Sequence, residues 1–293
     1  MNKWRVGLLA VSAVAVMVAV ADRANAACTR PMLQAAVDSY LAAQKAGDRT
    51  KMTFTGKAKF RQDMNDIAAD MGLWNTSLAI DHVRSFYDVD RCKTFSEVIV
   101  AKPAHQYVIG TRLTVEDGKI AVIDSLVTEK GDWLFNANSY LKHSSGEDWH
   151  PLSPIERSSE QSLIAAGNEY LDLFSDKLSD PPWGIPCARL EGGAYTDRKS
   201  DPNATCKVGI PGGVLYIVNR DYVVDEEMGV VNIFCRFGNS QTGMADSHTF
   251  RLVNGKLRWV HTLSVSPTKN SPQATDEGEI VRTSAPAPAP PAK

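Results

Sequence analysis

The stretch LQAAVDSYL (residues 33–41) returns 130 residues later as LIAAGNEYL (residues 163–171), with Leu, Ala, Ala, Tyr and Leu at identical spacings. In both copies apolar residues recur every three or four positions, which is the period of an amphipathic helix. A second echo pairs DGKI (117–120) with NGKL (254–257), 137 residues apart, and each places a Gly turn among strand-forming residues. The two offsets predict duplication of one α+β unit of about 120 residues, with chance matching as the alternative.

The hydropathy pattern between these markers predicts the remaining elements. Helices are expected at residues 33–45 and 162–177, with further helix at 54–71. Strands are expected at residues 96–101, 107–115, 119–128, 213–218, 222–224, 229–237, 248–253 and 256–265. Because helices precede strands without βαβ alternation, the order indicates an α+β fold with antiparallel sheets. A strongly curved sheet wrapped on helices would form a cone with an apolar mouth.

The N-terminus has the pattern of an export signal over residues 1–26. Lys3 and Arg5 precede an apolar run at 6–21, and Ala24-Asn25-Ala26 supplies the small residues of a cleavage site. The run is shorter than the about 20 residues that span a bilayer, although an uncleaved anchor helix is the alternative. The sequence therefore predicts an exported protein, periplasmic or extracellular, without a membrane span after cleavage.

Removal of the signal leaves three segments. Two units are expected at residues 27–150 and 151–265, followed by a tail at 266–293 that ends in Ala-Pro repeats. The tail has no apolar period, which predicts a disordered or polyproline-like extension.

Composition excludes several classes of partner. The 293 residues are 43% hydrophobic and 23% charged, a balance typical of chains with a packed core. A formal charge of −2 provides no general basic field for nucleic acid or an anionic membrane surface. The chain contains no GxSxG, GxGxxG or GxxxxGK[ST] motif. A small molecule is thus the expected partner, and homo-oligomerisation stays open.

Five cysteines remain after the signal, and outside the cytoplasm nearby thiols are usually oxidised. Cys187 and Cys206 flank a loop rich in Gly, Asp, Asn and Pro, which predicts a disulfide there. Cys28 and Cys92 are the expected second pair, because this pairing gives one disulfide bond to each half of the chain. Cys235 is left over within an apolar run and is expected to be buried and inert. No cysteine or histidine spacing matches a metal site, so neither a metal nor a cofactor is predicted.

The order of helix, loop and curved sheet ending in a DGKI hairpin resembles the nuclear transport factor two-like superfold, also called SnoaL-like. PCARLEGGAYT (186–196), NRDYVVDEEMG (219–229) and DSHTFRLVNGKLRWVHT (246–262) are similar to a secreted fungal and bacterial family long catalogued as a domain of unknown function. The resemblance is dense over residues 183–262 and thinner in VIGTRLTVEDGKIAVID (108–124). Bacterial members of that family include glutathione-independent β-etherases. The resemblance therefore implies tandem SnoaL-like cones and cofactor-free cleavage of β-aryl ethers in lignin-derived dimers.

Residues spaced by two along a strand face one side of the sheet, so polar side chains of a cone can converge on one cavity. Two histidines in predicted strands are the first candidates for chemistry there. His248 can exchange protons near ambient pH; the alternative is a core or rim histidine hydrogen-bonded to Asp246. His261 lies where Asp124 falls in the first repeat, and it is either a pocket acid or base or a structural histidine.

An acid, a cation and a phenol follow in PCARLEGGAYT. Arg189, Glu191 and Tyr195 together could bind and protonate a phenolic or alcoholic oxygen, with a salt-bridged sheet edge as the alternative. Asp225 begins a turn, so it is either a second catalytic acid or a turn-forming residue. The expected substrate-binding residues complete the set: Arg189, Arg251, Arg258, His261, Trp183 and Trp259.

The predicted function is that of an exported β-etherase acting by acid-base chemistry in the second unit, where the polar motifs cluster. His248 serves as base or acid, Glu191 or Asp225 as its complement, and Tyr195 with Arg189 holds the oxygen. The alternatives are a periplasmic module that binds small aromatic molecules, a ketone isomerase, and a partner-binding protein whose Ala-Pro tail reaches another chain.

Overall fold

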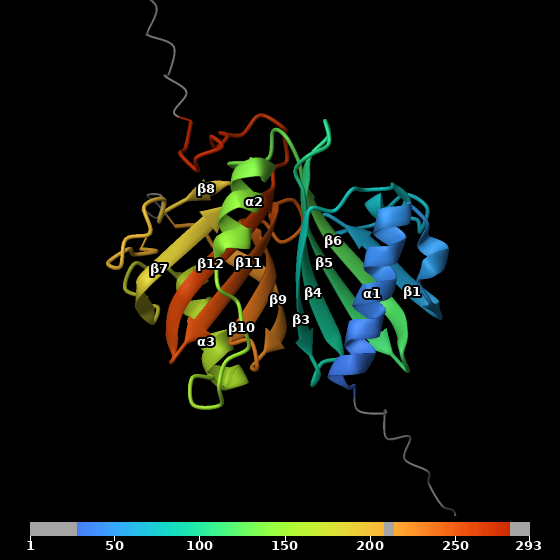
Figure 1. Cartoon of the computed structure of the whole chain (residues 1–293), viewed down its shortest axis with the longest axis horizontal. Helices are drawn as coiled ribbons and strands as arrows, with labels where there is room; N and C mark the ends of the chain where they lie inside the picture. The colour runs from blue at the N-terminus through green and yellow to red at the C-terminus, as the bar shows by residue number, and fades with distance from the viewer. Residues whose placement is uncertain (1–27, 208–213, 282–293) are drawn as a thin grey trace, which may run out of the picture.

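A computed structural model describes residues 28–207 and 214–281, so the predicted signal peptide and the Ala-Pro repeats lie outside the described residues. Two units follow one another along the chain (Figure 1). The first contains α1 (Arg30–Ala46), β1 (Phe54–Gln62), β2 (Asn65–Asp66), β3 (His82–Asp88), β4 (Lys93–Val100), β5 (Tyr107–Glu116) and β6 (Lys119–Thr128). The second contains α3 (Glu160–Asp172), β7 (Trp183–Glu191), β8 (Ala194–Tyr195), β9 (Ile217–Asp225), β10 (Val230–Phe237), β11 (Met244–Val253) and β12 (Lys256–Val265). A helix that the sequence did not predict, α2 (Ala137–Gly146), lies between them.

Each unit is built on one six-stranded sheet, and the predicted α+β class with two curved sheets on helices is confirmed. The strand orders are β2-β1-β6-β5-β4-β3 and β8-β7-β12-β11-β10-β9. The expectation of purely antiparallel sheets is wrong, because β1 pairs with β6, and β7 with β12, in parallel. The sheets are therefore mixed.

The predicted helix over residues 54–71 is also wrong, since this segment begins with β1. Lys57, Lys59 and Arg61 alternate with less polar residues at the period of a strand. The segment pairs with β2 and β6, so contacts distant in sequence select the extended conformation.

Register shows that the two units are copies. Pairs of neighbours in the first sheet are Phe86 with Phe95, Phe95 with Arg112, and Arg112 with Asp124. Adding 137 to each number gives the paired neighbours of the second sheet: Val223 with Asn232, Asn232 with Thr249, and Thr249 with His261. The offset predicted from one hairpin therefore holds across four strands, which supports duplication over chance matching.

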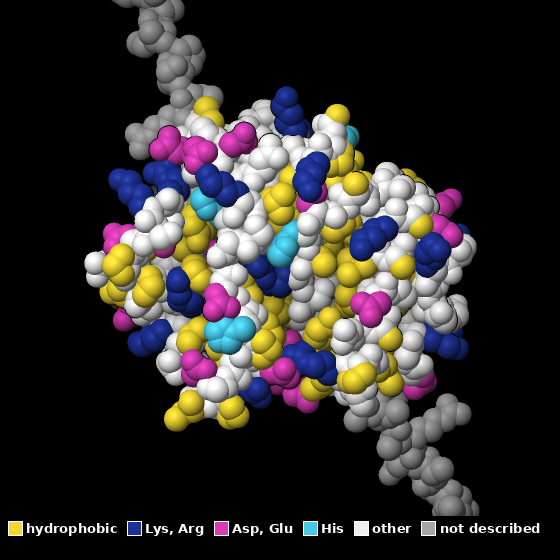
Figure 2. Space-filling model, in the orientation of Figure 1, with side chains coloured by type: hydrophobic (Ala, Val, Ile, Leu, Met, Phe, Trp, Pro, Cys, Tyr) yellow, Lys and Arg dark blue, Asp and Glu magenta, His cyan; other side chains and the backbone are white. Residues whose placement is uncertain are grey.

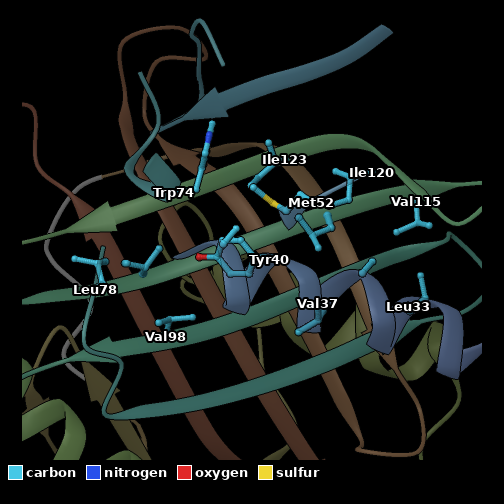
Figure 3. Close-up of a cluster of buried hydrophobic side chains, with 14 of the residues drawn as sticks. Leu33, Val37, Tyr40, Met52, Trp74, Leu78, Val98, Val115, Ile120 and Ile123 are labelled. Atoms are coloured by element: carbon cyan, nitrogen blue, oxygen red, sulfur yellow. The ribbon is translucent and has the colours of Figure 1, made fainter. Parts of the chain in front are cut away.

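The helix of each unit packs on the inner face of its own sheet. Figure 3 shows Leu33, Val37 and Tyr40 of α1 among side chains of the first sheet, including Val98 and Ile123. Thr29 caps the start of α1, where its hydroxyl accepts a hydrogen bond from the backbone of Met32, and Gly47 caps the end in a left-handed conformation. Leu163, Ala166 and Tyr170 of α3 pack likewise in the second unit.

The outer faces of the two sheets meet along a seam in the middle of the molecule (Figure 1). Phe95 and Phe234 are in edge-to-face contact there, with ring centroids 6.1 Å apart. Arg112 of β5 donates to the Asn232 side chain at 2.9 Å and to the Asn232 carbonyl at 2.7 Å. Apolar packing and hydrogen bonds therefore both join the two units across the seam.

The segment after β12 differs from the sequence-based expectation. Residues 266–281 lie against the linker between the units and against β8. Ser266 N donates to the buried Asp132 at 2.8 Å, Leu134 N donates to Pro272 O at 2.7 Å, and Tyr195 N donates to Gly278 O at 2.9 Å. We call residues 266–281 the C-terminal strap. A disordered extension from Ser266 is wrong for the strap, because its polar partners come from distant residues that local composition does not reveal.

Both predicted disulfides are confirmed, Cys28–Cys92 in the first unit and Cys187–Cys206 in the second, and Cys235 is buried and free. Within the described ranges, no helix has the length and apolarity needed to cross a bilayer. Acidic and basic side chains are interspersed on the face shown in Figure 2, in keeping with the small net charge.

Candidate acid-base site in the second unit

His248 lies on the inner face of β11, the face that α3 covers. Its Nδ1 is 2.5 Å from Asp246 Oδ1, and the two side chains are 4% and 0% exposed. No described residue hydrogen-bonds to His248 Nε2. A carboxylate that accepts from Nδ1–H orients the imidazole and leaves Nε2 available for proton transfer.

Asp246 is held by two further donors. Ser264 donates to Asp246 Oδ2 at 2.5 Å, and the Cys235 thiol lies 3.8 Å from Oδ1. Burial and the Asp246 charge raise the pKa of Cys235 well above its usual value, so the thiol stays protonated. These donors satisfy both oxygens of the buried Asp246 side chain.

The same three residues have the donor atoms of a metal site. Ligand atoms of Cys235, Asp246 and His248 lie within 4.8 Å of one another. In the structure these atoms are joined by hydrogen bonds, His248 Nδ1 to Asp246 Oδ1 at 2.5 Å and the Cys235 thiol to the same oxygen at 3.8 Å.

Aromatic side chains enclose His248. The ring centroids of Tyr170, Phe237 and Phe250 lie 5.6, 5.9 and 5.7 Å from the imidazole. Tyr170 belongs to α3, and its hydroxyl accepts a hydrogen bond from Arg189 at 3.3 Å. Burial raises the pKa of Tyr170, so its phenol is neutral and can donate a hydrogen bond.

Glu191 and Arg189 extend this face to β7. Arg189 and Glu191 form an ion pair at 2.7 Å. Glu191 is paired in register with Thr262, and Thr262 with His248, which places Glu191 and His248 two strands apart, about 10 Å between backbones. Thr262 Oγ1 and Arg189 Nε are buried without a described hydrogen-bond partner. Two polar atoms on the face between the acid and the histidine are therefore unpaired.

A cavity of about 620 Å³ opens beside Arg189 and Glu191. Its other walls come from β8 and the strap, including Tyr195 and Ile280, so the cavity brings Tyr195 together with Arg189 and Glu191. The volume is in the range of small-molecule sites. His248 and Tyr170 are not among the residues that line this cavity, and Arg189, which does line it, donates to the Tyr170 hydroxyl.

The first unit lacks this chemistry at the equivalent positions. With the offset of 137, His248 corresponds to Thr111, Asp246 to Ile109 and Ser264 to Val127. Tyr40, the counterpart of Tyr170, is 2.8 Å from Thr111 Oγ1, which in turn is 2.8 Å from Ser125 Oγ. The first inner face therefore has a closed set of neutral hydroxyl groups where the second has an ionisable pair.

Tyr195 and Asp225 do not join His248. Gly192, with φ of 61°, begins a turn after which Tyr195 pairs with Leu190 and shares its outward face. The Tyr195 hydroxyl donates to Glu147 at 3.1 Å. The Asp225 carboxylate, 2% exposed, binds Arg30 at 2.8 Å and joins β9 to the first unit. Sheet face and long-range partners decide both placements, and neither is visible in local spacing.

His261 also lies on the outer face, buried at the seam. Its Nδ1 is 2.9 Å from Glu97 and its Nε2 is 2.7 Å from Glu147. Burial alone would lower the pKa of His261, but the charges of Glu147 and Glu97 outweigh it and raise the pKa to about 9. The imidazolium in turn outweighs burial at Glu97, whose pKa falls to about 2. His261 is therefore an ionic link between the units.

The remaining candidates divide between the two faces. Trp183 contacts the Tyr170 ring at 5.8 Å and lies near the His248 site. Trp259 is buried at the seam, with Arg258 stacked on its ring at 3.3 Å. Arg251 is buried there too and donates to His150 O at 2.7 Å. Only Trp183 among these contacts the inner-face residues.

Sequence reasoning missed Tyr170 and Ser264 as members of the site. Tyr170 belongs to the repeated helical stretch, and the apolar spacing of that helix predicts a core residue at its position. Its counterpart Tyr40 has the same spacing. The two tyrosines differ in their partners, which are Arg189 for Tyr170 and Thr111 for Tyr40. Ser264 lies two residues after Thr262 on β12. Because side chains two residues apart on a strand share one face, the predicted strand was enough to place Ser264 on the same face as Thr262.

The family match falls in the second unit. Residues 156–264 match the family described as "Domain of unknown function (DUF8021)". No curated protein matches the chain.

Among solved structures, the chain is similar to an "NTF-2 like protein of unknown function" from Burkholderia xenovorans LB400, at 11% identity and a TM-score of 0.28, covering 40% of this chain and 96% of that one. It is similar to AclR, "a putative hydroxylase" from Streptomyces galilaeus, at 12% identity and a TM-score of 0.27, covering 41% and 89%. A "putative SnoaL-like polyketide cyclase" from Jannaschia sp. CCS1 gives 14% identity and a TM-score of 0.22, covering 41% and 91%.

Proposed function

We propose that the second unit is an acid-base enzyme that cleaves the β-aryl ether of lignin-derived aromatic dimers without a cofactor. One observation carries the acid-base assignment: His248 and Asp246 form a buried pair where the first unit has Thr111 and Ile109. A buried, oriented imidazole with a free nitrogen is suited to proton transfer. The ether substrate is the part of the proposal that comes from the family resemblance.

The proposed reaction has two steps. The Glu191 carboxylate takes the proton from the β-carbon while the α-hydroxyl leaves as water, protonated from His248 Nε2, and a carbon-carbon double bond forms. Water then adds to the β-carbon of this enol ether as the α-carbon gains a proton, and the aryloxy group leaves with a proton as the phenol. A ketone is the second product, and the water lost first balances the water consumed later. Each step needs a donor and an acceptor, which Glu191 and His248 provide.

The surroundings of the pair fit this substrate. Arg189 and the neutral Tyr170 phenol, whose polar atoms lie 3.3 Å apart, can both donate to one ether or hydroxyl oxygen of the substrate. Tyr170, Phe237 and Trp183 offer ring faces and edges to an aromatic substrate. Asp225 has no part in this scheme, because it binds Arg30 at the seam. Tyr195 borders the cavity beside Arg189 and Glu191, but its hydroxyl donates to Glu147, so no step is assigned to it.

The direct test is to incubate the purified chain with guaiacylglycerol-type ethers and identify both products by chromatography and mass spectrometry. We expect a phenol and a ketone in equal amounts. A triol in place of the ketone would show direct hydrolysis and contradict the dehydration step. Absence of phenol from several such dimers would defeat the enzyme assignment. If those dimers nevertheless raised the melting temperature, the result would favour the binding module instead.

A further inference from the structure

Arg236 is a buried cation without an anionic partner. The residue is 7% exposed, and its guanidinium donates to Gly243 O at 2.7 Å and to Met64 O at 3.2 Å. No carboxylate of the described residues lies within ion-pair distance of it. Carbonyl oxygens satisfy hydrogen bonds but do not neutralise the charge, and an uncompensated buried charge is unfavourable.

Arg236 lines a cavity of about 600 Å³ at the end of the seam opposite α2. Lys93 and Arg61 contribute two more cations to its walls, and Asp221 and Asp124 contribute two carboxylates. Lys93 is 2.7 Å from Asp221, and Arg61 is 3.2 Å from Asp124, so each acid already faces a cation.

Arg112 lies next to this cavity and adds to the positive charge, since it also contacts Asp221, at 3.1 Å. Four guanidinium or ammonium groups thus surround two carboxylates. The Phe234 and Met64 side chains provide apolar wall beside the charges.

The duplicated unit offers an internal comparison. With the offset of 137, Arg236 corresponds to Ile99, which is buried beside Tyr140 and Ala137 of α2. At that end of the seam a helix covers the sheet, and Glu97 and Glu147 neutralise His261. At the other end, Arg236 replaces the isoleucine and faces a cavity.

We propose that this cavity binds a small anion, a carboxylate or a phosphate, whose charge completes the coordination of Arg236. Lys93 and Arg61 border the same space and add electrostatic attraction. The site is on the outer face of the sheet, separate from His248, and the proposal does not depend on the proposed reaction.

Isothermal titration calorimetry on the full chain tests the proposal with two probes, benzoate and inorganic phosphate. We expect one of them to bind with a stoichiometry of one, and the better probe identifies the anion class. Arg236→Gln should weaken that binding about tenfold or more, because a charge-assisted contact is lost. The matched control is Arg49→Gln, at an exposed arginine of the first unit, which should bind like the unaltered chain.

Folding of each variant is checked by its thermal transition. If Arg236→Gln fails to fold, Lys93→Gln replaces it; this side chain is 23% exposed, and we expect binding several-fold weaker. Absence of binding by both probes at millimolar concentration would overturn the proposal. Unchanged affinity in a folded Arg236→Gln or Lys93→Gln chain, or equal weakening by Arg49→Gln, would overturn it as well.

Discussion

Thr111 and His248 occupy equivalent places on two copies of one sheet, and this exchange separates a neutral inner face from an ionisable one. Its neighbours change with it, since Ile109 and Val127 in the first unit become Asp246 and Ser264 in the second. A buried aspartate without the serine and histidine would be unfavourable, so these replacements depend on one another.

The two matched tyrosines give a prediction about single residues. Tyr170→Phe removes the hydroxyl that accepts from Arg189, and we expect kcat/KM for phenol release to fall about tenfold. Tyr40→Phe removes the equivalent hydroxyl from the first unit and should leave kcat/KM unchanged while costing about 1 kcal/mol of stability. Steady-state kinetics and urea unfolding of both variants check this. Equal kinetic effects in the two variants would contradict the assignment.

The ionic link at His261 predicts how stability depends on pH. The pKa of His261 is about 9 in the folded chain and its reference value is 6.5, so its stabilisation is fully present below pH about 6.5 and is lost as pH rises through about 9. The loss is on the order of 3 kcal/mol. The pKa of Glu97 is about 2 rather than 4.5, so its contribution is present above pH about 4.5 and is lost as pH falls through about 2.

Urea unfolding between pH 6 and pH 10 measures this link. We expect the free energy of unfolding to decline more steeply in the unaltered chain than in His261→Gln. Parallel curves would show that His261 is not the titrating group.

At the scale of elements, the helices and hairpins that the sequence predicts are those set by local spacing. The α1 and α3 helices carry a full apolar period, and β5–β6 and β11–β12 are joined by Gly turns. By contrast, α2 has its Tyr140 hydroxyl bonded to Glu97, 43 positions away, at 2.7 Å. Its formation depends on the seam, which no local pattern reveals.

The candidate site follows the same division. Strand alternation is enough to place His248 as a polar residue in a predicted strand, whereas Arg189 and Glu191 lie in β7, a strand that the sequence analysis did not predict. It does not reveal that Tyr195 lies beyond a turn, or that the partner of Asp225 is Arg30, 195 positions away. Residues whose role depends on a distant partner are the ones that local spacing misassigns.

The C-terminal strap gives a prediction about one element. Removing residues 266–293 deletes the Lys269 ammonium that lies 2.6 Å from the fully buried Asp132, together with the Pro272 and Gly278 backbone contacts. We expect the melting temperature to fall by about 5 °C or more, as for a loss of about 2 kcal/mol. Removing only residues 282–293 is the control and should leave it unchanged. Equal melting temperatures for both truncated chains would contradict a structural role for the strap.

At the scale of the whole molecule, two copies of one unit join through their outer faces and keep their inner faces apart. Phe95 and Phe234 fill the seam, and Arg30 with Asp225 and His261 with Glu97 link the units electrostatically. Joining the outer faces leaves each inner face to evolve separately, so one copy can hold a packed core while the other acquires ionisable groups.

The chain itself offers a matched pair of Asp-x-His motifs with which to test whether the second inner face performs the chemistry. Asp246 with His248 is buried, whereas Asp148 with His150 has the same contact, at 2.7 Å, on the surface. The decisive measurement is kcat for phenol release by His248→Gln and by His150→Gln. We predict a loss of about 10²-fold or more in the first and none in the second. Full activity in a folded His248→Gln chain would contradict the account.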